Sequence, residues 1–214
     1  MGSVGLHNDR CCCNFCAHSS SQTVPMPIRF RQTTLVKQAA SCLDTGGIVA
    51  YPTEAVWGLG CDPMNREATL RLLQIKARPV EKGMILVAAS TEQLGALYGD
   101  LDTQQREQLA QSWPGPFTWL LPDPQGRIPW WIRGDHDTVA VRVSAHPVVV
   151  ALCNAFGGPL VSTSANRAGQ PPARSRLQVM TRLRQAPDLI VPGALGGEAR
   201  PSTIRDLRSG KILR

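Results

Sequence analysis

Hydrophobic and polar positions alternate with two different periods along most of this chain. Apolar residues spaced three or four apart predict helices near 32–45, 65–77, 91–98, 103–112 and 175–185, and His146-Pro147 opens a further one. Short apolar runs predict buried strands. These strands are expected at 48–51, 84–88, 117–121, 138–143 and 160–164, with later ones near 188–192, 202–206 and 211–213.

Strands and helices therefore follow one another with several short connections. This order is typical of a mixed α/β sheet rather than of an all-helical or all-β protein. Residues 51–60 are predicted to form a turn, and the Pro-rich stretch 122–134 a loop that holds Trp130 and Trp131. We find no internal repeat and no linker, and expect a single-domain twisted mixed sheet flanked by helices.

Composition supports a globular protein in an aqueous compartment. The chain has 214 residues, of which 43% are hydrophobic and 18% charged, which is enough to bury one core. No apolar run approaches the roughly 18 residues that a membrane span needs, and the first residues lack the apolar region of a signal peptide. We expect a cytoplasmic protein without membrane contact.

The N-terminal stretch lacks periodicity. Residues 1–28 carry a Ser-rich run, and Met26 is an alternative start, so we expect a disordered or non-native extension before a domain at 29–214. Cys13-x-x-Cys16 has the spacing of half a zinc site, but no second pair follows it. The remaining cysteines lie in apolar segments where thiols pack as small hydrophobic groups, and no metal site is predicted.

The net charge of +7 is concentrated near the C-terminus. Residues 1–166 carry 13 basic and 13 acidic side chains, whereas residues 167–214 carry ten basic and three acidic ones. An arginine-rich excess of this kind favours a surface or cleft for a polyanion such as a nucleotide or RNA. The alternative is a solvated basic face.

Common nucleotide-binding fingerprints are absent: there is neither G-x-x-x-x-G-K-[ST] nor G-x-G-x-x-G. Lys76-Ala77-Arg78-Pro79 instead places two cations where a helix ends. Pro79 disfavours the helical conformation at Arg78, so both cations are able to turn toward one pocket. Lys82 adds a third charge; the alternative for the group is neutralisation of the helix dipole.

A second polar segment follows a predicted strand. Ser162-Thr163-Ser164-Ala165-Asn166 places three hydroxyls and an amide at the carboxyl end of that strand, where open α/β sheets bind ligands. A simple polar turn is the alternative. Arg142 lies on an otherwise apolar strand and needs an anionic partner, for which an anionic substrate is favoured over an internal carboxylate.

A conventional hydrolase is disfavoured. Asp135-His136-Asp137 resembles part of a catalytic triad, but no serine or cysteine in a strand-turn-helix elbow accompanies it. An exposed loop of mixed charge is the preferred interpretation. His146, next to Pro147, is interpreted as a residue at a helix start.

Taken together, these segments resemble the YrdC-like family, in particular its short bacterial threonylcarbamoyl-AMP synthases of the TsaC type. The resemblance runs from about residue 29 to 214. It is carried by Tyr51-Pro52-Thr53-Glu54-Ala55-Val56-Trp57-Gly58-Leu59-Gly60, Lys76-x-Arg78-Pro79, Trp113-Pro114-Gly115-Pro116, Val139–Val143 with His146-Pro147, and Ser162–Asn166. The joint occurrence of these segments in this order is what makes the resemblance specific.

The resemblance implies a YrdC-like fold with a deep basic cavity. It also implies an enzyme that converts L-threonine, bicarbonate and ATP, with Mg²⁺, into threonylcarbamoyl-AMP and pyrophosphate. The threonylcarbamoyl group then reaches the adenosine beside the tRNA anticodon through partner proteins, TsaB, TsaD and TsaE in bacteria. The absence of an additional C-terminal domain is consistent with dependence on such partners.

The resemblance also assigns residues. It implies catalytic roles for Lys76 and Arg78, and nucleotide binding by Arg78, Lys82, Thr138, Asn166 and Arg174. Threonine binding is implied for Thr53, Arg142, Ser164 and Ser202. Many relatives have threonine at the position of Ala55 and histidine near that of Val87, so this chain departs from the family pattern at its threonine end.

Two other functions stay open at this point. One is a non-catalytic protein that binds double-stranded RNA or tRNA through the basic last quarter; residues 167–214 lack the aromatic residues of single-strand readers. The other is a carbamoyltransferase-type relative that uses carbamoyl phosphate.

Overall fold

The computed structural model describes residues 1–2, 30–183 and 185–213 of the chain. Apart from residues 1–2, the expected extension at 1–28 and its Cys13-x-x-Cys16 pair lie outside this part. No helix among the described residues is long and apolar enough to span a membrane.

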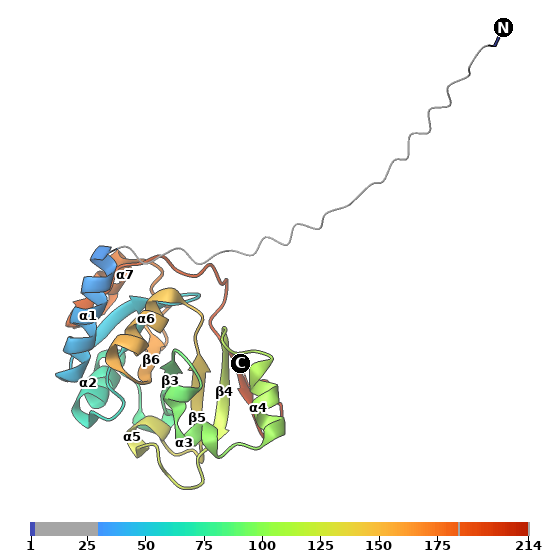
Figure 1. The fold of residues 1–214 in the computed structure, drawn as a ribbon. Coiled ribbons are helices and arrows are strands. Elements are labelled where there is room, and N and C mark those ends of the chain that lie inside the picture. The colour runs from blue at the N-terminus through green and yellow to red at the C-terminus, as the bar shows by residue number, and fades with distance from the viewer. Residues whose placement is uncertain (3–29, 184, 214) are drawn as a thin grey trace.

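One mixed sheet of eight strands organises the molecule, in the order β7-β1-β2-β6-β3-β5-β4-β8 (Figure 1). Three neighbouring pairs are parallel (β1 with β7, β3 with β5, β4 with β8) and the other four are antiparallel. The strands are β1 (Val49–Pro52), β2 (Trp57–Gly60), β3 (Ile85–Ala88), β4 (Phe117–Pro122), β5 (Thr138–Val143), β6 (Leu160–Ser164), β7 (Leu189–Ile190) and β8 (Thr203–Asp206).

Helices cover both faces of this sheet, and they begin where the sequence supplies caps. Asn65 caps α2 through its side chain, Asp102 and Gln105 form a capping box on α4, and Pro147 occupies the first turn of α6. The helices are α1 (Phe30–Asp44), α2 (Arg66–Lys76), α3 (Ala96–Gly99), α4 (Thr103–Ala110), α5 (Trp130–Arg133), α6 (Pro147–Phe156) and α7 (Arg176–Arg182), with short 3₁₀ turns η1 (Val80–Lys82) and η2 (Glu92–Leu94).

The two faces of the sheet differ because successive side chains on a strand point to opposite sides. Leu86, Val141 and Val161 belong to the larger core, which the helix α2 and the turns around α3–α5 cover. Val87 and Leu160, on the other face, pack under α1 and α6. These two helices do not extend over β4, β5 and the end of β6, so that part of the second face is left open.

Strand β2 departs from the expected turn at 51–60. Trp57–Gly60 pairs with β1 and with β6, so it is a central strand. Its glycines leave room for the buried ring of Tyr51: a Cβ at Gly60 would lie 2.6 Å from Val161 O and 2.8 Å from the Tyr51 hydroxyl. Glycine is uncommon in strands, which is why the pattern predicted a turn.

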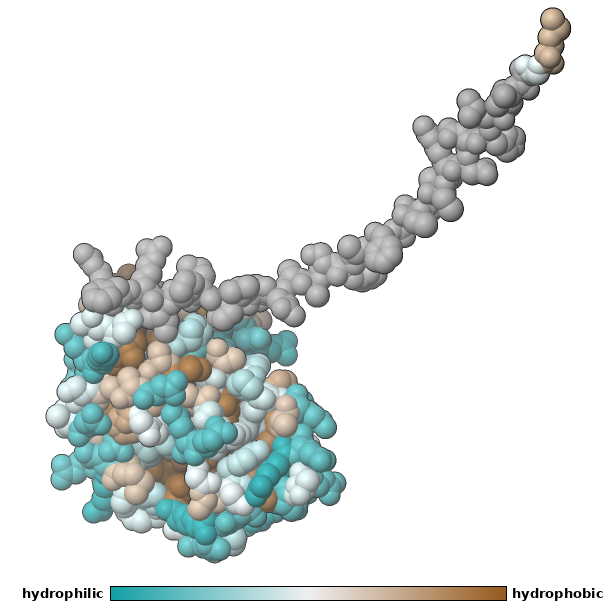
Figure 2. Space-filling view, in the orientation of Figure 1, coloured by the Kyte–Doolittle hydropathy of each residue, from teal (hydrophilic) through white to brown (hydrophobic). Residues whose placement is uncertain are grey.

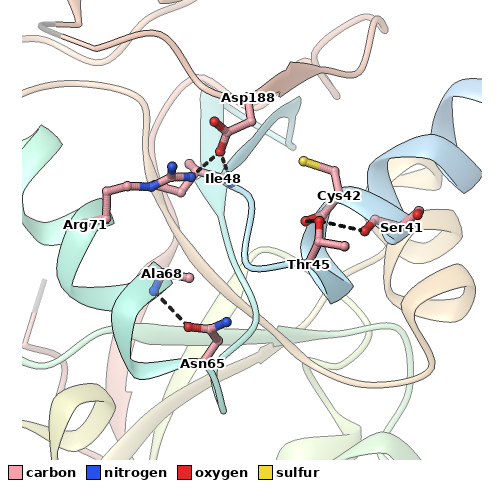
Figure 3. Close-up of polar contacts among 8 residues, drawn as sticks. All are labelled: Ser41, Cys42, Thr45, Ile48, Asn65, Ala68, Arg71 and Asp188. Atoms are coloured by element: carbon pink, nitrogen blue, oxygen red, sulfur yellow. Dashed lines mark hydrogen bonds and ion pairs between the residues drawn. The ribbon is translucent and has the colours of Figure 1, made fainter.

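The start of β7 is fixed by Asp188 (Figure 3). Its carboxylate accepts a hydrogen bond from Ile48 N at 2.6 Å and also binds the Arg71 guanidinium. Both charged side chains are about two-fifths exposed, 42% and 41%, so the ion pair itself contributes little and the backbone bond defines the edge of the sheet.

Residues 191–202, called the strap from here on, join β7 to β8. These two strands form opposite edges of the sheet, so the strap crosses its full width. Figure 1 shows it in red-brown, running from the side of α7 to β8. Backbone bonds from Gly196 N to Thr53 O (3.0 Å) and from Glu198 N to Glu54 O (2.9 Å) hold its middle against the loop between β1 and β2.

Most predicted elements are present, including strands 138–143 and 160–164 at their predicted limits. Two further predictions were wrong in detail. Trp130 and Trp131 begin a one-turn helix rather than lying in an irregular loop, and residues 211–213 contribute a single bridge, from Ile212 to Arg205, instead of a strand. In the view of Figure 2, hydrophilic residues gather over α4 and along the lower edge, with hydrophobic ones visible between them.

Candidate functional site

A cavity of about 700 Å³ lies on the open part of the second sheet face. Its floor comes from three neighbouring strands: Ile85 on β3, Thr138 and Arg142 on β5, and Ser162 on β6. The loop after β1, the turn after α2, the segment after β6 and the end of the strap complete the wall. The volume is in the range of small-molecule sites.

Basic side chains dominate this cavity. Among the described residues that line it there are six Lys or Arg and one carboxylate, Glu54. The basic residues are Lys76, Arg78, Lys82, Arg133, Arg142 and Arg200. The cavity is therefore suited to ligands that carry several negative charges.

The C-terminus of α2 positions two of these cations, Lys76 and Arg78. Arg78 N bonds Leu73 O and Ala77 N bonds Gln74 O, each at 3.0 Å, which is the Schellman arrangement at a helix end. Ala77 occupies the left-handed position at φ 49°, the only non-glycine among the described residues with positive φ. This reversal, rather than Pro79 alone, allows Lys76 and Arg78 to line the same cavity.

Lys76 is 3% exposed, and its ammonium donates to two backbone carbonyls in the segment after β6, Ser164 O and, at 2.8 Å, Asn166 O. Burial, reinforced by the neighbouring charge of Arg78, lowers its pKa to about 8. Lys76 thus holds the Ser164–Asn166 segment, which is distant in sequence, and its ammonium group loses its proton at a lower pH than an ordinary lysine does.

The turn after α2 is held by Arg78. Its guanidinium donates to Gly83 O at 2.9 Å and to Lys82 O at 3.1 Å. These bonds close the turn that contains η1 and bring Lys82, whose side chain is exposed, to the cavity edge.

The segment after β6 presents an amide to the cavity. Asn166 Nδ2 donates to Arg167 O and Gln170 O at 2.9 and 2.6 Å, whereas its Oδ1 is buried and has no hydrogen-bond partner in the protein. Buried polar atoms are almost always paired, so an unpaired acceptor at a cavity wall is available to a ligand donor.

Arg142 has an internal carboxylate partner, the alternative that was not favoured from the sequence. Its NH1 lies 3.4 Å from Glu54 Oε2, and both side chains are 10% exposed. Ser144 Oγ donates to the other oxygen, Glu54 Oε1, at 2.6 Å. Arg142 Nε and Glu54 Oε2 make no hydrogen bond.

His146 extends this group of polar residues to the strap. Its backbone N donates to Ser144 Oγ at 3.1 Å, and Nε2 bonds Ala194 O at 3.1 Å. A carbonyl only accepts, so Nε2 carries the hydrogen and Nδ1, buried without a partner, is the bare nitrogen. Burial lowers the pKa of His146.

The remaining predicted residues are half-buried or buried. Thr53 Oγ1 donates to Val56 O at 2.7 Å, Ser202 Oγ accepts from Thr118 at 2.9 Å, and Thr138 lies on the floor. Ala55 lines the cavity. Val87 is fully buried beneath α6 and does not line the cavity.

Nine of the ten residues predicted for the site line this one cavity, although they come from distant parts of the chain. Arg174 does not: it is exposed and donates to Ala199 O at 2.8 Å, next to Arg200. Binding roles for all ten residues stay predictions.

Sequence reasoning missed Glu54, Arg133, His136 and Arg200, which also line the cavity. An acidic residue inside a buried segment was a usable signal for Glu54. His136 belongs to the predicted exposed loop, and it is exposed while reaching the cavity edge; the neighbouring Asp137 binds Arg208 at 2.6 Å. The strap has no regular pattern, so Arg200 was counted only as part of the basic excess of residues 167–214.

Comparisons with known proteins agree on one family. The model of the Sua5/YciO/YrdC family, described as "telomere recombination", matches residues 41–214. A protein named threonylcarbamoyl-AMP synthase from Stutzerimonas stutzeri is 56% identical over 84% of this chain and 96% of its own length. One from Halorhodospira halophila is 54% identical over 84% and 93%.

Solved structures give the same result. P. abyssi Sua5 complexed with L-threonine is 34% identical with a TM-score of 0.74, over 84% of this chain. This chain spans about half, 53%, of that protein. E. coli YciO is 25% identical with a TM-score of 0.72, over 85% of this chain and 89% of its own length.

Proposed function

Because this chain belongs to the Sua5/YciO/YrdC family, we propose that it is a threonylcarbamoyl-AMP synthase. It takes L-threonine, bicarbonate and ATP and releases threonylcarbamoyl-AMP and pyrophosphate. The observation that carries this proposal is the single cavity that gathers nine of the ten predicted residues. The high identity to relatives of that name over nearly their full length supports it.

The chemistry suits a site rich in cations. The threonine amine adds to CO₂ derived from bicarbonate and forms a carbamate anion, whose oxygen attacks the α-phosphate of ATP as pyrophosphate leaves. Two anions must meet, so the protein's main contribution is charge neutralisation and positioning rather than proton transfer. The proposed reaction therefore does not depend on a Ser–His or Cys–His catalytic pair.

Roles follow from position. Lys76, Arg78 and Lys82 lie around the turn after α2 and are proposed to hold the phosphates. Asn166, with its unpaired Oδ1, is proposed to accept a hydrogen bond from the nucleotide. Arg142, on the floor, is proposed to bind the threonine carboxylate, and Thr53, Ser164 and Ser202, which line the same cavity, are proposed to contribute to threonine binding.

Mg²⁺ is proposed to enter the cavity bound to the ATP phosphates. The described part of the cavity offers one carboxylate, Glu54, and its oxygens already face Ser144 and Arg142. Protein sites for Mg²⁺ use at least one or two carboxylates together with substrate phosphates. The described lining, with its one carboxylate already paired, therefore does not form a protein site for the metal.

The direct test is mass spectrometry of the product formed from ATP, L-threonine and ¹³C-bicarbonate by the purified protein. We expect an adenylate that carries one ¹³C, and pyrophosphate release that requires both threonine and bicarbonate. Product formation from carbamoyl phosphate instead of bicarbonate would identify the carbamoyltransferase-type alternative. Absence of any adenylate would refute the proposal.

RNA contact and transfer to tRNA belong to the same proposal. Exposed basic residues of the last quarter, among them Arg176, Arg182 and Lys211, support binding of a polyanionic backbone. Part of the charge excess has structural partners, because Arg205 stacks on Phe117 with its guanidinium 4.9 Å from the ring centre. Reconstitution with TsaB, TsaD, TsaE and unmodified tRNA tests the transfer.

A further inference from the structure

Among the described residues that line the cavity, Glu54 is the one carboxylate, and it compensates the positive charge unevenly. Glu54 faces one particular cation, Arg142, at 3.4 Å. Lys76, by contrast, donates to the backbone carbonyls of Ser164 and Asn166, which leave its positive charge uncompensated. Ser164 lies four residues beyond Leu160, which is level with Arg142 across β3, so the two cations lie toward different ends of the cavity. The cavity therefore has a cationic end near the turn after α2 and a charge-balanced end at Arg142.

We propose that Glu54 is a specificity-determining residue that keeps polyphosphate away from Arg142 and so reserves this end of the cavity for a zwitterionic amino acid. The inference rests on the proposed function. Without a neighbouring carboxylate, Arg142 would attract ATP phosphates and pyrophosphate as strongly as the other cations do. With Glu54 beside Arg142, a ligand that carries both a carboxylate and an ammonium group finds an oppositely charged partner for each.

Hydrogen bonds hold both the side chain and the backbone of Glu54 in place. Ser144 Oγ donates a hydrogen bond to Glu54 Oε1. Ser144 follows Arg142 by two residues, so both side chains lie on the same face of the extended chain, and both contact the Glu54 carboxylate. The backbone of Glu54 is held as well, by the bond from Glu198 N. Gly196 allows this approach, because a Cβ there would lie 2.9 Å from the Glu54 Cα.

The ion pair also leaves capacity for a ligand. Its separation of 3.4 Å is longer than the roughly 2.7–2.9 Å of an optimal charge-assisted hydrogen bond. A guanidinium has five N–H donors, so one carboxylate at this distance does not saturate it. Glu54 balances the charge of Arg142 without closing it to a substrate carboxylate.

The experiment uses initial rates of adenylate formation with inorganic pyrophosphate as inhibitor. For the wild-type protein we expect pyrophosphate to raise the KM for ATP and to leave the KM for threonine unchanged at saturating ATP. For Glu54→Gln we expect pyrophosphate to compete with threonine as well. The inhibition constant against threonine should become measurable and lie at least about tenfold below the lower limit set by the wild-type protein, since one charge within 4–6 Å alters the affinity for an anion by about that order.

Three further variants make the result specific. Glu198→Gln, an exposed acid on the strap, is the matched control and should behave as wild type. Glu54→Asp should restore the wild-type pattern because it restores the charge. Glu54→Gln with Arg142→Gln removes both charges and should bind threonine weakly without the new competition; this pair also avoids an unpaired buried charge if the single variant is unstable.

The outcomes separate the two proposals. No adenylate from the wild-type protein would refute the proposed function. Adenylate from the wild-type protein, with the same pyrophosphate pattern in Glu54→Gln, would overturn the inference alone. New competition with threonine that persists in the double variant would also overturn it, because Arg142 would then not be the group that attracts pyrophosphate.

Discussion

Raising the pH from 7 to 9 should weaken ATP binding through one side chain, Lys76. Its pKa of about 8 in the free protein results first from burial and then from the charge of Arg78. The ammonium is therefore about nine-tenths charged at pH 7 and about one-tenth charged at pH 9. If the phosphates bind the charged form, the Kd for ATP rises about tenfold over this range.

Isothermal titration calorimetry of MgATP measures both the affinity and the protons taken up. Binding favours the charged amine, so ATP raises the pKa of Lys76, and binding at pH 8 should take up about half a proton. Titrations in buffers of different ionisation enthalpy reveal this uptake. Lys76→Arg stays charged over the whole range and should show neither effect.

A constant Kd between pH 7 and 9, with no proton uptake at pH 8, would refute this reasoning. It would mean that Lys76 serves only to hold Ser164 O and Asn166 O. Proton uptake that persists in Lys76→Arg would have the same consequence, because another group would then be titrating.

Two other predictions concern stability. Gly60→Ala should lower the free energy of unfolding by about 1–3 kcal/mol in urea denaturation, because the new Cβ would lie 2.6 Å from Val161 O in the neighbouring strand; an unchanged midpoint would contradict the packing described for β2. His146 should make the protein less stable in acid. Its folded-state pKa is lowered by burial, so its contribution is complete above the unfolded value of about 6.5 and is lost as the pH falls below that through the folded value. Urea midpoints at pH 5 and 7 measure this loss, which should persist in His136→Gln and shrink in His146→Gln.

Apolar runs made much of the fold predictable from the sequence. Strands such as Thr138–Val143 are continuous or alternating apolar segments because one or both faces are buried, and their limits were correct. Strand β2 was missed because its alternate residues are glycines, whose role is to accommodate the ring of Tyr51. Such a role depends on a neighbour in space, which local patterning does not contain.

The site was predictable where residue type alone carries the chemistry. Lys76 and Arg78 were identified as cations at a helix end, and their shared cavity was expected. The left-handed Ala77 that directs them was not, because alanine rarely adopts this conformation. The pairing of Arg142 with Glu54 was also missed, since β2, β6 and β3 separate β1 from β5 in the sheet, and the two residues meet only where the loop after β1 lies against β5 in the folded chain.

The strap also has a consequence for biosynthesis. Ribosomes make the six central strands, and with them the floor of the cavity, before either outer strand of the sheet exists. The two edge strands β7 and β8 and the strap between them come from consecutive residues, 189–206. A nascent chain that has emerged only as far as α7 holds Arg142 and Lys76 but still lacks Arg200 and Ser202. Several residues that complete the cavity wall are thus among the last that the ribosome adds.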